Sequence, residues 1–411
     1  MSLPDLIARN RRGEAVGLPS WCTAHPETLA AILSSYRDDT APILIEATCN
    51  QVNQFGGYTG MTPARFRSFV EAIARAQGVD PARLILGGDH LGLNPWRTQP
   101  SQTAMDKART LVADYVKAGF TKIHLDCSMA CADDVALPEA EIAGRAADLC
   151  AVAEATAATG PLHYVIGTEV PIPGGETAPL DTLAVTTPEA ARRTLDLHRE
   201  AFAARGLSGA FARVIALVVQ PGVDFGNDQV FAFDPARAAA LCAAAPALGG
   251  PLFEAHSTDY QSPTALKALV DGHFAILKVG PELTFAFRKS AFALANLAEH
   301  LGMTDTLRPA LIAAMRADPA DWRPYVEKGT REEEMMLYGL SDRVRYYWTK
   351  RGVHAAFNDL AQRVRYARPE PDLVAKVTEG IVPETDDDVP AAVIDGMVGA
   401  VVAKYRGATG A

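Results

Sequence analysis

Asp89 and His90 are the residues of this sequence whose types and spacing most clearly suggest chemistry. They follow an apolar run and two glycines in the segment RLILGGDHLGLNPW. A carboxylate and an imidazole delivered together at the end of a strand can transfer a proton or bind a metal ion. In parallel α/β proteins, ligands bind at the carboxyl ends of the strands. The alternative is a buried Asp-His pair that satisfies its own hydrogen bonds.

Polar residues also end the other apolar runs, and this repetition favours the functional interpretation. They are Glu46 with Asn50 and Gln51, Asp126, Glu169, Gln220 with Asp224, His256 with Ser257 and Asp259, and Lys278 with Glu282. Such groups are costly to bury unless they are paired or bound to a ligand, so their concentration predicts a site. Two imidazoles with carboxylates suit a divalent metal such as zinc or manganese, with one position open for substrate. A hydrogen-bonded polar barrel mouth without metal is the alternative.

The other histidines give weaker signals. His25 ends the first apolar run, within reach of a substrate. His124 and His163 fall inside apolar runs, where we expect ordinary packed residues without a role in the site. The remaining four are expected on helices or on the surface: His198, His273, His300 and His354.

Eight apolar runs of strand length alternate with helical patterns. They span residues 20–24, 42–48, 83–89, 121–126, 162–169, 213–220, 251–256 and 274–280. Thr62 before Pro63, Asp234 before Pro235, and Pro263 have the residue types that begin helices. Eight such units with nearly continuous apolar strands predict an α/β fold, the (β/α)8 TIM barrel. An open doubly wound sheet is the alternative, and it is weaker because no G-x-G-x-x-G follows the first run.

Beyond residue 300 the pattern is helical without strands. We therefore expect a TIM barrel over residues 1–300 and a helical C-terminal extension over residues 301–411. Within the extension, the segment 338–348 (YGLSDRVRYYW) mixes arginines with aromatic residues. That composition is typical of an interface between domains or subunits.

Composition limits the classes of function. With 411 residues and 48% hydrophobic content, the chain can bury a large core. The net charge of −10, with scattered basic residues, argues against nucleic acid or an anionic membrane as a partner. Six cysteines without a CxxC pair indicate reduced thiols. Neither a signal peptide nor an apolar run of membrane-spanning length is present, so we expect a cytoplasmic protein.

Seven motifs, in order along the chain, resemble the GatZ/KbaZ-like family. They are GGDHLGLNPW, KIHLDCSM, IGTEVPIPGGE, VVQPGVDFG, FEAHSTDYQSP, ILKVGPELTFA and YGLSDRVRYYW. The family carries the labels tagatose-6-phosphate kinase and tagatose-1,6-bisphosphate aldolase subunit Z, and it is similar to class II, metal-dependent ketose-bisphosphate aldolases.

The aldolase likeness assigns roles to individual residues. It implies that Asp89 transfers protons, that His90 and His256 bind metal, and that Glu169 matches a further site residue. Gln220 stands where those aldolases have another metal-binding histidine. A metal site would then need Glu169 or Asp224 to complete its ligands.

The resemblance implies a ketose 4-epimerase that interconverts D-tagatose 6-phosphate and D-fructose 6-phosphate. The hydrogen on C4 is not α to the C2 carbonyl, so simple deprotonation cannot epimerise C4. Either a nicotinamide transiently oxidises C4, or the C3–C4 bond is cleaved and remade. The missing dinucleotide fingerprint favours cleavage without a nucleotide cofactor. A metal would polarise the carbonyl, and Asp89 or Glu169 would accept the C4 hydroxyl proton.

The sugar phosphate has a wide set of expected contacts. For substrate binding we expect Glu46, Asn50, Gln51, Asp126, Gln220, Ser257, Asp259, Lys278 and Glu282. Of these, Lys278 and Ser257, together with Arg288, are the candidates for holding the phosphate group.

The alternative function is a non-catalytic subunit that stabilises a separate class II aldolase. Gln220 in place of histidine and altered phosphate loops favour it, and the segment 338–348 would then be a docking surface. Under either function we expect a homo-oligomer.

Overall fold

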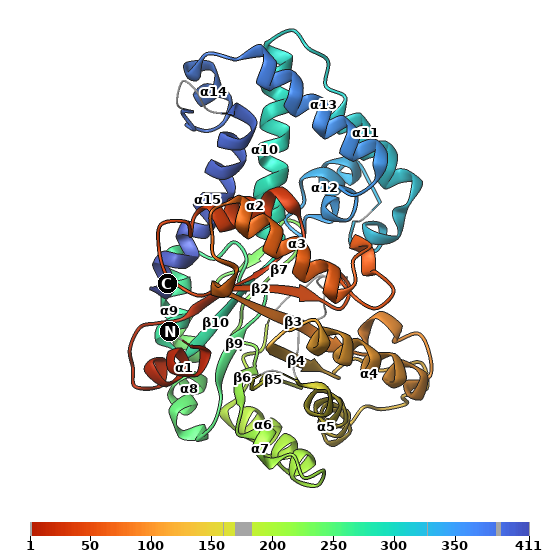
Figure 1. Cartoon of the computed structure of the whole chain (residues 1–411), viewed down its shortest axis with the longest axis vertical. Helices are drawn as coiled ribbons and strands as arrows, with labels where there is room; N and C mark the ends of the chain where they lie inside the picture. The colour runs from red at the N-terminus through yellow and green to blue at the C-terminus, as the bar shows by residue number, and fades with distance from the viewer. Residues whose placement is uncertain (1, 159, 169–182, 327, 384–387, 411) are drawn as a thin grey trace.

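The centre of the molecule is a closed barrel of eight parallel strands (Figure 1). A computed structural model describes residues 2–158, 160–168, 183–326, 328–383 and 388–410. The strands follow one another around the barrel as β1 (Leu18–Cys22), β2 (Ile43–Thr48), β3 (Leu84–Gly92), β4 (Lys122–Asp126), β5 (His163–Ile166), β6 (Val214–Val218), β9 (Leu252–Ala255) and β10 (Phe274–Val279), which pairs with β1. All eight apolar runs are strands, so the predicted TIM barrel is confirmed and the open sheet is wrong.

Helices surround the barrel. They are α2 (Pro26–Ser34), α3 (Pro63–Ala76), α4 (Ser101–Lys117), α5 (Glu139–Thr156), α6 (Pro188–Ala203), α7 (Ser208–Phe211), α8 (Pro235–Ala244), α9 (Pro263–Asp271) and α10 (Pro281–His300). Asp234 accepts a hydrogen bond from the backbone N–H of Ala236 and so caps α8 as expected. Thr62 makes no such bond, and α3 begins instead with the preset backbone angle of Pro63. In the described parts of the chain, no helix is both long and apolar enough to cross a membrane.

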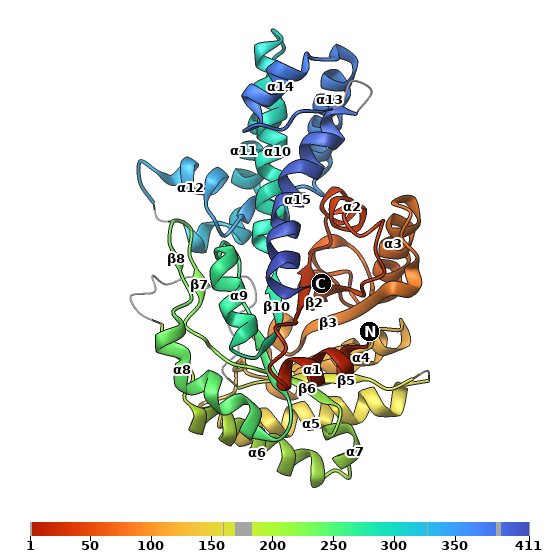
Figure 2. The same cartoon turned by 90° about the vertical axis from the view of Figure 1, so that its left-hand side faces the viewer.

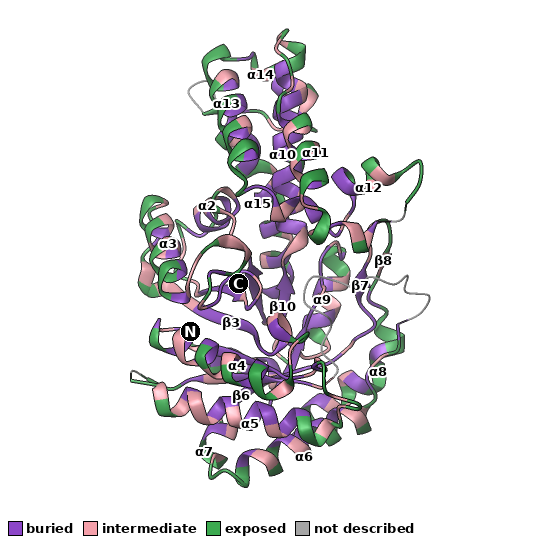
Figure 3. Cartoon of the chain, turned by 90° about the vertical axis from the view of Figure 1, so that its right-hand side faces the viewer, coloured by how far each residue is buried: buried purple, intermediate pink, exposed green. Residues whose placement is uncertain are grey.

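The interior of the barrel is apolar at one end and polar at the other. At the amino ends of the strands, Leu18, Leu44 and Ile276 form one cluster with Leu3 and Leu6 of helix α1 (Leu3–Arg11), which closes the barrel. Two residues further along each strand, the same face carries buried polar groups, because side chains alternate with a period of two. These are Ser20, Glu46, Lys122, Glu254 and Lys278. Figure 3 shows that the strands are buried almost throughout.

Strand β3 departs from regular alternation where the site begins. Its pairing register with β4 shifts between Gly88 and Leu91, and His90 adopts a left-handed backbone conformation with φ of 49°. This is a β-bulge, which lets Asp89 and His90 both face the interior although they are consecutive. A side chain at Gly87 would lie 2.2 Å from Oε1 of Glu46, so glycine at this position makes room for that carboxylate.

A helical lobe covers the carboxyl ends of the strands (Figures 1 and 2). Besides the outer part of α10, it contains α11 (Leu307–Ala317), α12 (Glu332–Tyr338), α13 (Arg351–Ala367) and α14 (Pro371–Val377). The short hairpin of β7 (Asp224–Phe225) and β8 (Val230–Phe231) lies beside it, and the backbone N–H of Leu340 donates to the carbonyl of Asn227 in that hairpin.

The last helix, α15 (Val389–Thr409), returns from the lobe to the barrel and packs against α2, α9 and α10. The ring centroids of Trp21 and Tyr405 are 5.8 Å apart, and the Tyr405 hydroxyl donates to the carbonyl of Thr258 at 2.7 Å. The backbone N–H of Gly17 donates to the carbonyl of Thr409 at 2.9 Å. Residues more than 380 positions apart in the sequence thus join the last helix to the start of the barrel.

We expect Gly92→Ala to destabilise the protein strongly. The added Cβ would lie 1.6 Å from the carbonyl oxygen of Asp126, so β3 and β4 would have to separate. Overpacking of this kind costs about 1–3 kcal/mol or more. Gly407→Ala is the matched control, because it lies in an exposed part of α15 with nothing within 4 Å of the new Cβ. Urea unfolding should show a lower free energy for Gly92→Ala only; equal stability of the two variants would contradict the prediction.

Candidate active site

A cavity of about 770 Å³ lies between the barrel and the helical lobe. The barrel contributes strand-end residues that include Cys22, Thr48 and Asp89, and the lobe contributes the segment that contains Arg345 and Tyr346. Small-molecule sites typically occupy about 300–1,000 Å³, so the cavity has room for a phosphorylated hexose.

Three imidazoles meet at the barrel side of this cavity. The ring centroids of His90 and His256 are 5.0 Å apart, and those of His90 and His124 are also 5.0 Å apart. His124 and His256 complete the triangle at 5.3 Å. All three rings are nearly or completely buried. Residues from β3, β4 and the end of β9 are therefore close enough to share one ion.

Each imidazole is hydrogen-bonded through one ring nitrogen to a carboxylate. His90 Nδ1 lies 2.7 Å from Oδ2 of Asp126, and His256 Nε2 lies 3.0 Å from Oε1 of Glu254. Since ionised carboxylates only accept, these two nitrogens carry protons. The opposite nitrogen of His90, Nε2, lies 3.4 Å from Oδ2 of Asp89. Carboxylates commonly orient metal-binding histidines in this way.

The third imidazole, His124, has the same arrangement. Its Nδ1 lies 2.9 Å from Oδ1 of Asp89 and 3.2 Å from the backbone nitrogen of His90. The contact with Asp89 uses a proton on Nδ1, whereas the backbone N–H of His90 donates to a lone pair on the same atom, so the two contacts belong to different tautomers. The Nε2 atom is buried and has no hydrogen-bond partner among the described residues. A buried nitrogen with a free lone pair is costly unless it binds something.

Alternating charges lie directly beneath the imidazoles. Lys122 Nζ lies 2.7 Å from Glu46 and 2.8 Å from Glu254, and Lys278 Nζ contacts both Glu46, at 3.1 Å, and Asp89. The Ser20 hydroxyl donates to Glu46 at 2.6 Å. Every one of these ionic side chains is at least nine-tenths buried, so each charge depends on its neighbours for stabilisation.

The network keeps its groups charged. Burial would raise the pKa of Glu46, but the ammonium groups of Lys122 and Lys278 hold it below its usual value. Asp89 is also buried, yet neighbouring His90 and Lys278 hold its pKa well below the ordinary range. Burial would lower the pKa of Lys122, but the carboxylates around it raise the value instead. The carboxylates and ammonium groups therefore remain ionised at neutral pH.

The imidazole of His256, unlike these carboxylates and ammonium groups, is uncharged at neutral pH. Burial lowers its pKa to about 4, which leaves a neutral ring at neutral pH. Four carboxylates (Glu46, Asp89, Asp126 and Glu254) and two ammonium groups surround the three imidazoles in this cluster.

The donor set fits a divalent metal ion. Ligand atoms of Asp89, His124, Glu254 and His256 all lie within 4.8 Å of one another, and His90 adjoins them. Neutral imidazoles with carboxylates are the ligands that zinc prefers. A divalent cation would place positive charge among the four carboxylates, and it would give Nε2 of His124 a partner.

The structure distributes the expected substrate contacts between the cavity wall and the layer behind it. Asn50, Gln51, Ser257, Asp259 and Lys278 line the cavity, as do His25 and Asp224. Glu46 and Asp126 lie behind it and hold Lys122 and His90. Gln220 accepts from the backbone of Gly222 and Val223, and Glu282 binds Tyr260 N–H and Lys404. Glu169 lies outside the described residues.

Two residues expected to contact phosphate form ion pairs with carboxylates of the protein instead. Arg288 is 2% exposed, lies outside the cavity lining and bonds through Nε to Oδ1 of Asp342 at 2.8 Å. Lys278 is already neutralised by Asp89 and Glu46. Neither cation is free to pair with an anionic substrate group.

His124 is packed inside β4 as expected, but its ring lies 5.0 Å from that of His90, and Glu254 and Lys122 beside this cluster were not predicted. The signal was present as spacing of two: Lys122, His124 and Asp126 share one face of β4, and Glu254 and His256 share one face of β9. Once a strand end is assigned to the site, the residues two positions earlier on the same face belong to it as well.

The segment 338–348 is an interface within the chain. Asp342, Arg343 and Tyr347 are almost completely buried, and Arg345 and Tyr346 line the cavity. Asp342 accepts hydrogen bonds from Thr284 and Arg288 of α10. The expected docking surface for another protein is therefore wrong for most of this segment, because its side chains are used to attach the lobe to the barrel.

Two named relatives are similar to this chain over most of its length. The chain is 46% identical over 418 aligned positions to a D-tagatose 6-phosphate 4-epimerase of Agrobacterium fabrum, covering 99% of this chain and 98% of that protein. It is 49% identical over 354 positions to the D-tagatose-1,6-bisphosphate aldolase subunit GatZ of Escherichia coli O1:K1, covering 84% of each.

A solved structure has the same fold over almost the whole length. The crystal structure of a probable tagatose 6 phosphate kinase from Sinorhizobium meliloti 1021 superposes with a TM-score of 0.87 at 44% identity, covering 95% of this chain and all of that one. The sequence profile described as D-tagatose-1,6-bisphosphate aldolase subunit GatZ/KbaZ-like matches residues 3–409. The chain therefore belongs to the GatZ/KbaZ-like family.

Proposed function

We propose that this protein is a ketose-phosphate 4-epimerase that interconverts D-tagatose 6-phosphate and D-fructose 6-phosphate. The observation that supports it most is the meeting of three carboxylate-backed imidazoles at one end of a cavity large enough for the substrate. A relative that is 46% identical over nearly the whole chain carries the name of this activity.

The reaction proceeds by breaking and remaking the C3–C4 bond. A base takes the proton of the C4 hydroxyl, C4 becomes an aldehyde, and the bonding electrons pass to C3 as an enediolate. The aldehyde then presents its other face, C3 attacks it, and the proton returns to the oxygen on C4. No net oxidation occurs, so the step needs no nucleotide cofactor.

Asp89 is the proposed proton acceptor in the described part of the site. The contacts with His124 and Lys278 fix the orientation of its carboxylate and keep it ionised. Glu169 is the second proposed acid–base group, on the grounds of its place in the sequence.

His90, His124 and His256 are the residues that would hold a zinc or manganese ion, and Nε2 of His124 is a ring nitrogen without a described partner. When bound, such an ion stabilises negative charge that develops on the C2 oxygen. Asp126, Asp89 and Glu254 orient the three rings. Lys122 and Lys278 keep those carboxylates ionised and in place.

A non-catalytic aldolase subunit is the second candidate function. The 49% identity to GatZ proteins favours it as much as the epimerase relative favours catalysis. Under this alternative the isolated chain would convert neither sugar phosphate, and a separate class II aldolase would lose stability when expressed without it. The buried ionic network weighs toward catalysis, since a purely stabilising partner has no use for a buried imidazole nitrogen without a partner.

We expect the purified protein to convert D-tagatose 6-phosphate to D-fructose 6-phosphate and back to the same equilibrium. Treatment with a chelator should abolish the conversion, and added zinc or manganese should restore it, because the C2 oxygen then regains its charge stabilisation. Proton NMR of the C4 position follows both directions. Absence of fructose 6-phosphate before chelation and after metal addition would exclude the epimerase.

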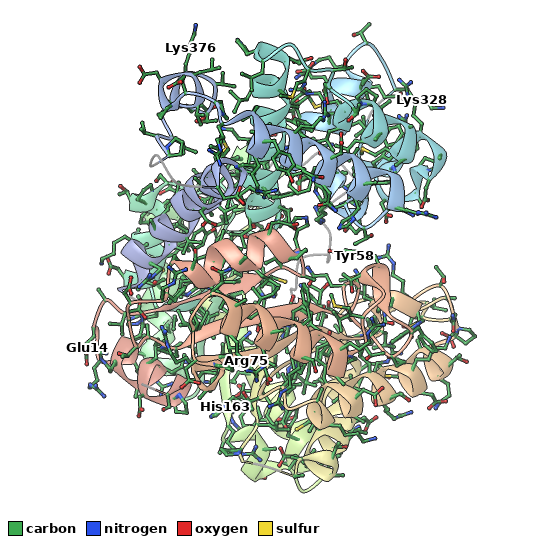
Figure 4. The ribbon with its side chains drawn as sticks, turned by 45° about the horizontal axis from the view of Figure 1, so that its top comes forward. Glu14, Tyr58, Arg75, His163, Lys328 and Lys376 are labelled. Atoms are coloured by element: carbon green, nitrogen blue, oxygen red, sulfur yellow. The ribbon has the colours of Figure 1, made fainter. Side chains whose placement is uncertain are left out.

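Replacing His124 tests the metal site without relying on activity. We expect His124→Ala to lower zinc affinity at least about tenfold, because one ring nitrogen of the donor set is lost. His163→Ala is the control, since His163 begins β5 at the amino end of the barrel and lies well away from Tyr58 at the mouth (Figure 4). Titration with a competing zinc indicator measures both. Unchanged zinc affinity in a folded His124→Ala protein would contradict the assignment.

A further inference from the structure

Four cationic side chains line the cavity. They differ in their exposure to solvent and in the carboxylates that pair with them. Lys278 is paired with Asp89 and Glu46. Arg331 is exposed and pairs with Glu334, and Lys328 is exposed to solvent. Arg345 differs from the other three because it combines two properties. It is partly buried, and it has no carboxylate within ion-pair distance in the described parts of the chain.

Arg345 is held in place by neutral groups. Its Nη1 donates to the carbonyls of Ser341 and Asp342, and its Nη2 donates to the hydroxyl of Tyr346 at 3.0 Å. The guanidinium also lies 4.6 Å from the centroid of the Tyr346 ring. These contacts orient the side chain but leave its positive charge uncompensated and its Nε–H without a described acceptor. A planar guanidinium with free donors suits a phosphate group.

The usual phosphate position of a barrel is closed in this protein. Phosphate groups often bind at a helix N-terminus beside the last strands. Here the N-terminus of α10 is filled by Asp259, whose Oδ1 accepts from the backbone N–H groups of Gly280 at 3.0 Å and Glu282 at 2.8 Å. A phosphate there would meet an occupied site, and Asp259 itself would repel it when ionised.

A continuous wall connects Arg345 to the imidazole cluster. The Tyr58 and Tyr346 rings pack edge to face with centroids 4.6 Å apart, and Tyr58 lies between the barrel and the lobe (Figure 4). Next to Tyr58, Oε1 of Gln51 lies 3.7 Å from Sγ of Cys22, at the end of β1. Gln51, Cys22, Tyr58 and Arg345 all line the same cavity as His90. Arg345 and the imidazole cluster therefore border one continuous space.

We propose that Arg345, supplied by the helical lobe, binds the phosphate group of the sugar substrate. This inference rests on the proposed function for the identity of the sugar. Bond cleavage between C3 and C4 leaves the phosphate on the aldehyde fragment, which must turn over without leaving. A cation on the lobe, across the cavity from the imidazoles, holds that fragment by its far end while the aldehyde carbon reorients.

The test uses ligands that cannot react, so that it is independent of turnover. D-Glucitol 6-phosphate and D-glucitol differ only in the phosphate, and inorganic phosphate reports the anion alone. Isothermal titration measures their binding to the metal-loaded wild type, Arg345→Gln, Arg345→Lys and Arg351→Gln. Arg351 is exposed on the same lobe and lies outside the cavity lining, so it is a matched control. Thermal unfolding checks that each variant is folded.

We expect Arg345→Gln to weaken binding of D-glucitol 6-phosphate about 10- to 100-fold, because charge-assisted hydrogen bonds are lost. Arg345→Lys should recover part of the affinity, D-glucitol should be unaffected, and Arg351→Gln should match the wild type. Equal binding of D-glucitol 6-phosphate to the wild type and a folded Arg345→Gln, or no preference of the wild type for the phosphorylated ligand, would overturn the proposal. If the epimerase assay fails while binding of the phosphorylated ligand still depends on Arg345, only the proposed reaction is overturned.

Discussion

The compensation of buried charge inside the barrel is the constraint on which the rest of the structure depends. Glu46, Asp89 and Glu254 are taken out of water, and the ammonium groups of Lys122 and Lys278, together with neighbouring histidines, keep them ionised there. Desolvation of an unpaired charge costs several kcal/mol, so each member of the network requires the others. Asp89 and Glu254 also fix the orientation of His124 and His256 by hydrogen bonds to their rings. The geometry of the site is thus a consequence of electrostatics within the barrel.

The backbone makes room for this network. Gly87 leaves space for the Glu46 side chain, and Gly92 allows β3 to pass directly over the carbonyl of Asp126. The bulge at His90 turns two consecutive residues toward the interior, at the cost of a left-handed conformation that non-glycine residues seldom adopt. Such strain persists only where surrounding contacts require it, and here His90 is held by Asp126 at 2.7 Å.

The helical lobe is part of the same unit. Helix α10 continues from the last strand into the lobe, and α15 comes back to pack against the barrel beside β1. Arg288 and Asp342 form a buried ion pair where the lobe meets the barrel, so the segment between α12 and α13 is placed with little freedom over the cavity. The proposed substrate site uses this arrangement, with one wall from the strand ends and the other from a region that the sequence presents as a separate extension.

The sequence by itself determined the barrel, because eight nearly continuous apolar runs and helix-starting prolines are local signals. It also determined that Asp89, His90 and His256 meet, since parallel strands bring their carboxyl ends to one edge. Only the tertiary structure decided which polar groups become partners. His124 and Glu254 join the cluster, and Arg288 leaves it, through contacts between strands and helices far apart in the chain. Pairing of buried charges depends on distances across the barrel, and no local pattern of residues encodes those distances.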